Sequence, residues 1–171
     1  PMMNIVNGGC HANNRLDFQE FMIIPLGFKT FKDSLRCGCE VFYELKRILS
    51  SKSFSTSVGD EGGFAPDIKS NNECLDLISK AINKAGYKEG KEVFIGLDVA
   101  SSEFYQNKRH KLEGENLELT SENLIKYYEN LINNYPIISI EDALDENDWQ
   151  GWTDLTHAIG NKCQIVGDDL F

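Results

Sequence analysis

The sequence predicts an α/β fold in which parallel strands alternate with helices. The second half of the chain alternates apolar stretches of strand length with amphipathic stretches of helix length. The first half opens with two strand-like stretches followed by two helical patterns, and no linker-like segment divides the chain. With 171 residues and 41% hydrophobic content, the chain is long enough for one sizeable core. We therefore expect a single domain over residues 1–171.

The first half is expected to fold as two strands and then two helices. Thr30 is a plausible N-cap for the first helix. Ser70-x-x-Glu73 has the pattern of a capping box for the second helix, and Gly86 marks its end. The expected elements are strands within residues 2–6 and 16–24, a helix over 30–52 and a helix from 70 to 86.

The second half repeats a strand–helix order. Strands joined by helices in this way run parallel, with right-handed crossovers. The polar stretch over residues 105–118 interrupts the pattern and is expected to be a surface hairpin or loop, with His110 as a surface residue; His157 is also expected at the surface. The expected elements are strands at residues 92–98, 137–141 and 163–168, with helices at 121–135 and 148–159.

Each of these three strands ends at an acidic residue: Asp98, Glu141 or Asp168. The carboxyl ends of parallel strands lie at one edge of the sheet, so the three carboxylates should converge. Their repulsion would be costly without a cation, and all-oxygen ligation suits Mg²⁺. The alternative is that each acid caps the following helix, which becomes less favoured when three successive strands share the feature. Asp142 and Asp169 should point elsewhere and serve as caps or supporting groups.

The stretch "SVGDEGGFAP", residues 57–66, places two acids between glycines. By itself it would be an ordinary surface turn. Beside three converging carboxylates, we interpret it as a functional loop in which Glu61 faces the acids and Asp60 has a structural role. No regular element is expected to constrain the loop, so it should be free to move.

Five segments of the chain resemble the bacterial-type enolases, the phosphopyruvate hydratases of glycolysis. The resemblance covers essentially all 171 residues, and implies a modified (β/α)8 TIM-like barrel that begins ββαα. It also implies that the barrel is incomplete here, because the N-terminal α+β domain and the last barrel strands of the family are absent. The segments are "NIVNGGCHANNRLDFQEFMIIP", "VGDEGGFAP", "LDVASSEFY", "SIEDALDENDW" and "VGDDLF".

The resemblance also implies a role for each matched residue. The three strand-end acids match the magnesium ligands of the family. Glu61 matches the acid that acts on the leaving hydroxyl of 2-phosphoglycerate, and Glu20 matches its partner carboxylate. Gln19 matches a substrate contact, and His11 a histidine that approaches the substrate. Family members are usually homodimers through surfaces that include the absent domain.

Charge and composition exclude several other classes. The net charge of −10 argues against a nucleic-acid surface or an anionic-membrane patch. The apolar runs are too short to span a bilayer, and the start of the chain does not have the pattern of a signal peptide. An odd number of cysteines, five, without a C-x-x-C pair is typical of a reduced, cytoplasmic protein.

Two hypotheses stay open on the sequence. In the first, the chain is a piece of a glycolytic lyase and is inactive alone, because no lysine here matches the family's catalytic base. In the second, it is a non-catalytic, truncated enolase-like protein that binds Mg²⁺ or a partner. A different dehydrating member of the superfamily is less favoured, since "DFQEF" lacks the K-x-K base motif of those relatives.

Overall fold

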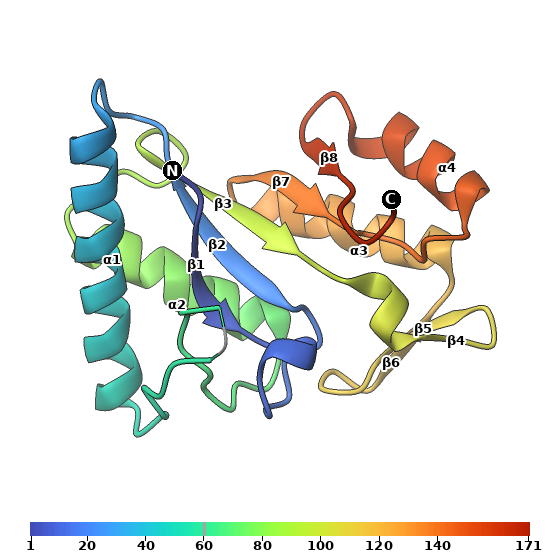
Figure 1. The fold of residues 1–171 in the computed structure, drawn as a ribbon, viewed down its shortest axis with the longest axis horizontal. Coiled ribbons are helices and arrows are strands. Elements are labelled where there is room, and N and C mark those ends of the chain that lie inside the picture. Colours follow the sequence, from blue (N-terminus) through green and yellow to red (C-terminus); the bar gives the residue numbers. More distant parts are fainter. Residues whose placement is uncertain (60) are drawn as a thin grey trace.

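The structure, a computed structural model, describes residues 1–59 and 61–171. Its centre is a five-stranded sheet in the order β1-β2-β3-β7-β8, seen obliquely in Figure 1. β1 and β2 pair antiparallel, as do β2 and β3, whereas β3, β7 and β8 are parallel. The bounds are β1 Met3–Asn7, β2 Glu20–Pro25, β3 Val93–Asp98, β7 Ile137–Glu141 and β8 Gln164–Val166.

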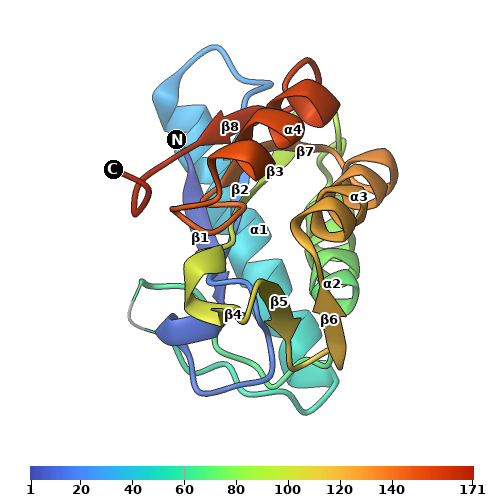
Figure 2. The same cartoon turned by 90° about the vertical axis from the view of Figure 1, so that its right-hand side faces the viewer.

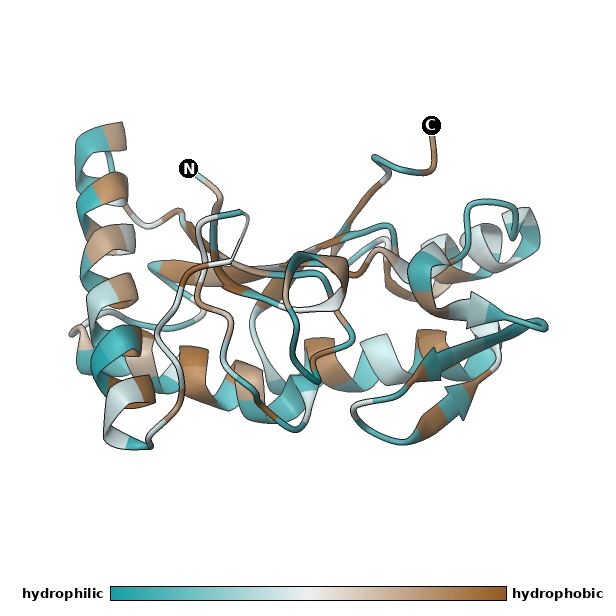
Figure 3. Ribbon diagram, turned by 60° about the horizontal axis from the view of Figure 1, so that its bottom comes forward, coloured by the Kyte–Doolittle hydropathy of each residue, from teal (hydrophilic) through white to brown (hydrophobic). Residues whose placement is uncertain are grey.

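Four helices accompany this sheet, and α2 and α3 run along one side of it in Figure 3. Thr30 and Ser70 cap their helices as predicted, each accepting a hydrogen bond at 3.1 Å from the backbone N–H three residues later. The Glu73 carboxylate accepts from the N–H of Lys69, at 3.3 Å, and not from that of Ser70. The bounds are α1 Phe31–Ser51, α2 Asn71–Lys84, α3 Ser121–Asn134 and α4 Trp149–Ile159, with short 3₁₀ turns η1 Gly9–His11 and η2 Ser101–Phe104.

The two faces of the main sheet differ in character. Residues that are paired across neighbouring strands point to the same face, and successive residues of one strand point to opposite faces. On one face, five fully buried side chains belong to the hydrophobic core: Phe21, Ile23, Ile95, Leu97 and Ile140. The other face carries Met22, Gly96 and Ser139 in one row. Glu20, Asp98 and Glu141 form the next row on that face, at the end of the strands.

The polar stretch at residues 105–118 is a small antiparallel sheet of three strands, visible below the main sheet in Figure 2. The prediction of a hairpin-like excursion is therefore confirmed, but the prediction that His110 lies at the surface is wrong. His110 is 0% exposed, because the small sheet packs against η2 and α3. His157 on α4 is exposed, as predicted. The bounds are β4 Tyr105–Gln106, β5 Arg109–Leu112 and β6 Leu117–Leu119.

The element order confirms the predicted fold class. Two strands and two helices come first, and strand–helix units with parallel strands follow. Over the described residues the sheet is open, with β1 and β8 at its edges, as expected for part of a barrel. Among those residues, no helix is both long enough and apolar enough to cross a membrane.

Candidate active site

The strand register builds one row of functional side chains across the sheet. Asn7 pairs with Glu20, Glu20 with Asp98, Asp98 with Glu141, and Glu141 with Val166. β2 runs antiparallel to β3, so the start of β2 lies at the carboxyl end of the parallel strands. We call Glu20, Asp98 and Glu141 the acid row.

The carboxylates of this row are crowded; Asp98 is buried, and Glu20 and Glu141 are partly buried. Oxygens of Asp98, Glu141 and the adjacent Asp142 lie within 4.8 Å of one another. Burial raises the pKa of Asp98 to about 7, and the charges of Glu141 and Glu20 add to the effect. The pKa of Glu141 is also raised, first by burial and then by Asp142 and Asp168. Among the described residues, the ion pairs that Lys and Arg make do not include these acids. Carboxylate oxygens that are close together and not paired with Lys or Arg are suitable ligands for a hard cation such as Mg²⁺.

The structure places Asp142 within this group and Asp168 outside it. Asp168 follows β8 after Gly167, is exposed, and is not a member of the 4.8 Å group, although its charge acts on Glu141. Asp142 does join that group. Its two carboxylate oxygens also accept the backbone N–H groups of Asp168, at 3.0 Å, and Asp169, at 2.9 Å. The expectation of a supporting role for Asp142 thus agrees with its bonds, but the expectation that it points elsewhere is wrong.

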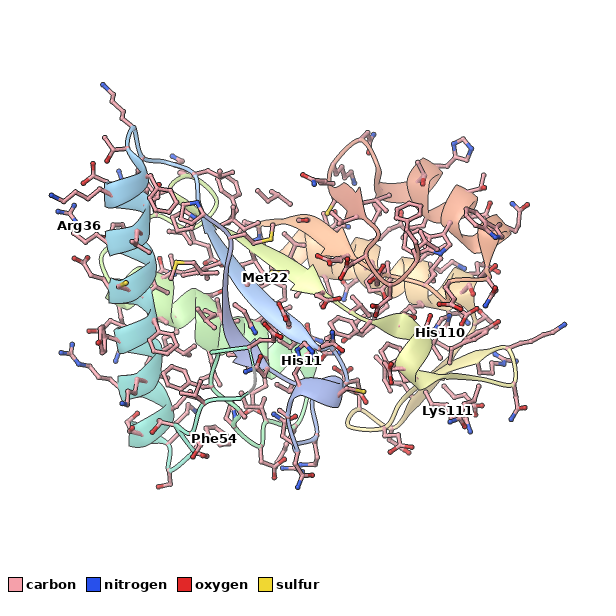
Figure 4. All side chains as sticks on the ribbon, viewed as in Figure 1. His11, Met22, Arg36, Phe54, His110 and Lys111 are labelled. Atoms are coloured by element: carbon pink, nitrogen blue, oxygen red, sulfur yellow. The ribbon has the colours of Figure 1, made fainter. Side chains whose placement is uncertain are left out.

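A second group of titratable side chains lies beside the acid row. His11, Glu20 and Glu61 each place a ligand atom within 4.8 Å of the others, and Figure 4 shows His11 near the start of β2. Nδ1 of His11 is 3.3 Å from Oε1 of Glu20. Burial raises the pKa of Glu20; the charge of His11 opposes this effect and that of Glu61 adds to it. Nε2 of Gln19, the residue before Glu20, donates to Oδ2 of Asp98 at 3.1 Å.

The loop that carries Glu61 is a tight turn with fixed ends. The N–H of Gly59 donates to the carbonyl of Gly63 at 2.8 Å. Phe64 exchanges backbone hydrogen bonds with β1, donating to Ile5 at 2.9 Å and accepting from Asn7 at 2.8 Å. The buried Asn7 side chain also donates to the Gly63 carbonyl, at 2.8 Å. The expectation that no regular element constrains this loop is therefore wrong, and Asn7 is a supporting residue that the sequence did not single out. The role predicted for Asp60 lies outside the described residues.

Gly62 and Gly63 provide a matched test of this turn. Gly62 has φ +86 and open space where a Cβ would stand, so Gly62→Ala should cost about 1–2 kcal/mol of unfolding free energy from backbone strain alone. A Cβ on Gly63 would lie 2.7 Å from the Ile5 carbonyl carbon and 2.8 Å from the Val6 nitrogen. We expect Gly63→Ala to cost more, because the turn must move off β1, and urea unfolding of the two variants measures the difference. Equal losses would mean that the turn is not packed against β1 as described.

A cavity between two segments of the described residues lies away from these groups. Its volume is about 480 Å³, and it lies between the segment around Arg15 and the small sheet. It is not lined by His11, Gln19, Glu20, Glu61 or the strand-end acids. The candidate site is thus the open carboxyl end of the main sheet rather than this cavity.

The fold and this site together define a class of protein: an α/β-barrel-type domain with carboxylates at the carboxyl ends of its strands. Comparison with protein families identifies the member of that class. The family model described as "Enolase, C-terminal TIM barrel domain" matches residues 1–171. The chain belongs to the enolase C-terminal barrel family, which points to an enolase-like lyase.

Proposed function

We propose that this chain is part of a Mg²⁺-dependent enolase of the bacterial type, which interconverts 2-phospho-D-glycerate and phosphoenolpyruvate plus water. The observation that carries the proposal is the meeting of two groups at one end of the sheet. One is the acid row, and the other contains His11 and Glu61. Dehydration of this substrate needs carboxylates that hold the metal and a positioned acid that protonates the leaving hydroxide.

The first step removes the C2 proton and leaves a dianionic carboxylate on the substrate. Mg²⁺, when bound, would supply positive charge that stabilises this dianion. We propose Asp98, Glu141 and Asp168 as its ligands, with Asp142 orienting the segment that carries Asp168 through the hydrogen bonds described above. All three proposed donors are carboxylate oxygens, and those of Asp98 and Glu141 already lie within 4.8 Å of each other.

The second step expels hydroxide, a poor leaving group that a positioned acid must protonate. We propose Glu61 as this acid, with Glu20 as its partner carboxylate. The closeness of the two carboxylates supports the pairing, since a negative neighbour favours the protonated form of a carboxyl group. His11 and Gln19 are proposed to contact the substrate. The turn formed by Gly59 to Gly63 would hold Glu61 at the edge of the site.

A base for the first step is not among these groups. We propose that a lysine on a later strand of a longer protein supplies it, and that the 171-residue chain alone does not turn over substrate. The N-terminal domain, the homodimer and the cytoplasmic location expected of the family belong to the same proposal.

A turnover assay tests the function directly. The protein encoded by the complete reading frame is compared with the 171-residue chain, and phosphoenolpyruvate formed from 2-phosphoglycerate is measured with Mg²⁺ and with EDTA. We expect turnover only in the longer protein and only with Mg²⁺. Absence of turnover in both proteins, together with Mg²⁺ binding, would favour the non-catalytic alternative.

A further inference from the structure

A buried histidine lies outside both acidic groups and connects several elements next to the acid row. His110 on β5 is 0% exposed, and Figure 4 places it beside η2. Its ring centroid is 4.7 Å from that of Tyr105 and 6.1 Å from that of Phe104. A polar ring so enclosed must find hydrogen-bond partners within the protein.

The two ring nitrogens of His110 face two serine hydroxyls. Nδ1 is 2.8 Å from Oγ of Ser101 on η2, and Nε2 is 3.4 Å from Oγ of Ser121, the first residue of α3. The Ser121 hydroxyl donates to Oδ2 of Asp148 at 2.5 Å. Oδ1 of Asp148 accepts the N–H of Gly151 at 3.0 Å and so caps α4. A chain of side-chain bonds thus joins η2, β5 and the beginnings of α3 and α4.

The direction of these bonds follows from the charge of the ring. Burial lowers the pKa of His110 to about 4, against the opposing charges of Asp145 and Asp148, so the ring is neutral at neutral pH. A neutral imidazole has one donor and one acceptor. The single proton of the Ser121 hydroxyl goes to Asp148, so the contact at 3.4 Å requires the tautomer in which Nε2–H of His110 donates to Ser121. In that tautomer Nδ1 accepts from the Ser101 hydroxyl.

Ser101, at one end of this series of hydrogen bonds, is connected to the backbone beside Asp98 and Asp142. Between Asp98 and Ser101, Ala100 has φ +47, in the left-handed region that non-glycine residues rarely adopt. The N–H of Ser101 donates to the carbonyl of Asp142 at 2.9 Å, and Asp142 itself has φ +45. The Asp142 carboxylate in turn holds the N–H of Asp168. Strained backbone of this kind persists only where the surrounding structure fixes it.

We propose that His110 is a positioning residue for the acid row: by tying Ser101 to α3 and α4, it fixes the turn after Asp98 and, through Asp142, the segment that carries Asp168. The consequence for Mg²⁺ binding rests on the proposed function, whereas the consequence for the backbone does not. His110 contacts no substrate in this proposal and acts only through Ser101.

Amide hydrogen exchange on the 171-residue chain tests the structural part. His110→Phe keeps the aromatic volume but removes both ring nitrogens, and His110→Asn restores an amide that can pair with Ser101. We expect His110→Phe to speed exchange of the Ser101 and Asp168 amides by at least about tenfold relative to that of Ile95 on β3, whose N–H donates to the carbonyl of Pro136 just before β7. His110→Asn should recover part of this protection. Unchanged exchange at Ser101 and Asp168, or an equal acceleration at Ile95, would overturn the proposal.

Two further measurements keep the test decisive. If His110→Phe does not fold, Ser101→Ala removes only one hydroxyl and should expose the same amides; protected amides in that variant would refute the proposal. Titration with Mg²⁺ alone should show about tenfold weaker binding in His110→Phe and recovery in His110→Asn. If the unmodified chain binds no Mg²⁺, the proposed metal site fails, and the exchange rates alone decide the role of His110.

Discussion

Replacing Asp98 by asparagine is expected to stabilise the metal-free chain and to abolish its stabilisation by Mg²⁺. Asp98 is buried to 8% exposure beside Glu141 and Glu20, and its pKa is raised to about 7. At neutral pH, the ionised side chain therefore costs free energy in the folded state that an uncharged amide of the same shape does not. Asparagine also keeps an oxygen that can accept the hydrogen bond from Gln19.

The expected gain in the stability of the metal-free chain follows from the raised pKa of Asp98. A rise from 3.8 to about 7 corresponds to about 4 kcal/mol, and after solvent screening and the loss of one acceptor oxygen we expect a gain of about 1–2 kcal/mol. Mg²⁺ at a hundred times its dissociation constant should stabilise the unmodified chain by about 2.7 kcal/mol and the variant by much less. Urea unfolding with Mg²⁺ and with EDTA measures both quantities.

Asp154→Asn is the matched control for Asp98→Asn. It removes the same charge from an exposed position on α4. It should change neither the stability of the metal-free chain nor the stabilisation by Mg²⁺. If Asp98→Asn lowers the free energy of unfolding of the metal-free chain, the charge on Asp98 does not destabilise the folded state. If Mg²⁺ stabilises the variant as much as the unmodified chain, Asp98 is not a ligand. In the longer protein, the same variant should lose most of its turnover, and Asp168→Asn should do so as well.

Glu61→Gln is expected to abolish dehydration in the longer protein while exchange of the C2 proton with solvent continues. The amide keeps the shape of the carboxyl group, but it cannot protonate the leaving hydroxide. Removal of the C2 proton is served by other residues in the proposed function, so deuterium from solvent should still enter 2-phosphoglycerate. Phosphoenolpyruvate formation measures the second step, and mass spectrometry of recovered substrate measures the first.

The control for this variant is Glu118→Gln on β6, an exposed glutamate in the small sheet, which should leave both steps unchanged. Loss of proton exchange together with dehydration in Glu61→Gln would mean that Glu61 organises the site instead of acting as its acid. Retention of dehydration would remove Glu61 from the reaction, and the Gly59–Gly63 turn would then be a structural feature of β1 only.

The sequence by itself determined the local elements and their order. Helix starts at Thr30 and Ser70 depend on side chains that bond backbone groups three residues away, so they can be read without the fold. Apolar runs ending at Asp98 and Glu141 likewise define their strands to the last residue. Parallel order then places Asp98 and Glu141 at one edge, which is why these two members of the acid row could be predicted from the strand ends.

The tertiary structure decided what depends on contacts between distant segments. His110 lies in a polar stretch, and its burial becomes apparent only when the small sheet packs beside η2 and α3. The strand register places Glu20 opposite Asp98, and packing of the Glu61 turn against β1 brings Glu61 to Glu20. Asp142 lies beside Asp98 and Glu141 with a backbone φ of +45. Hydrogen bonds from the N–H groups of Ser101 and Asp168, which are distant in sequence, hold it in this conformation.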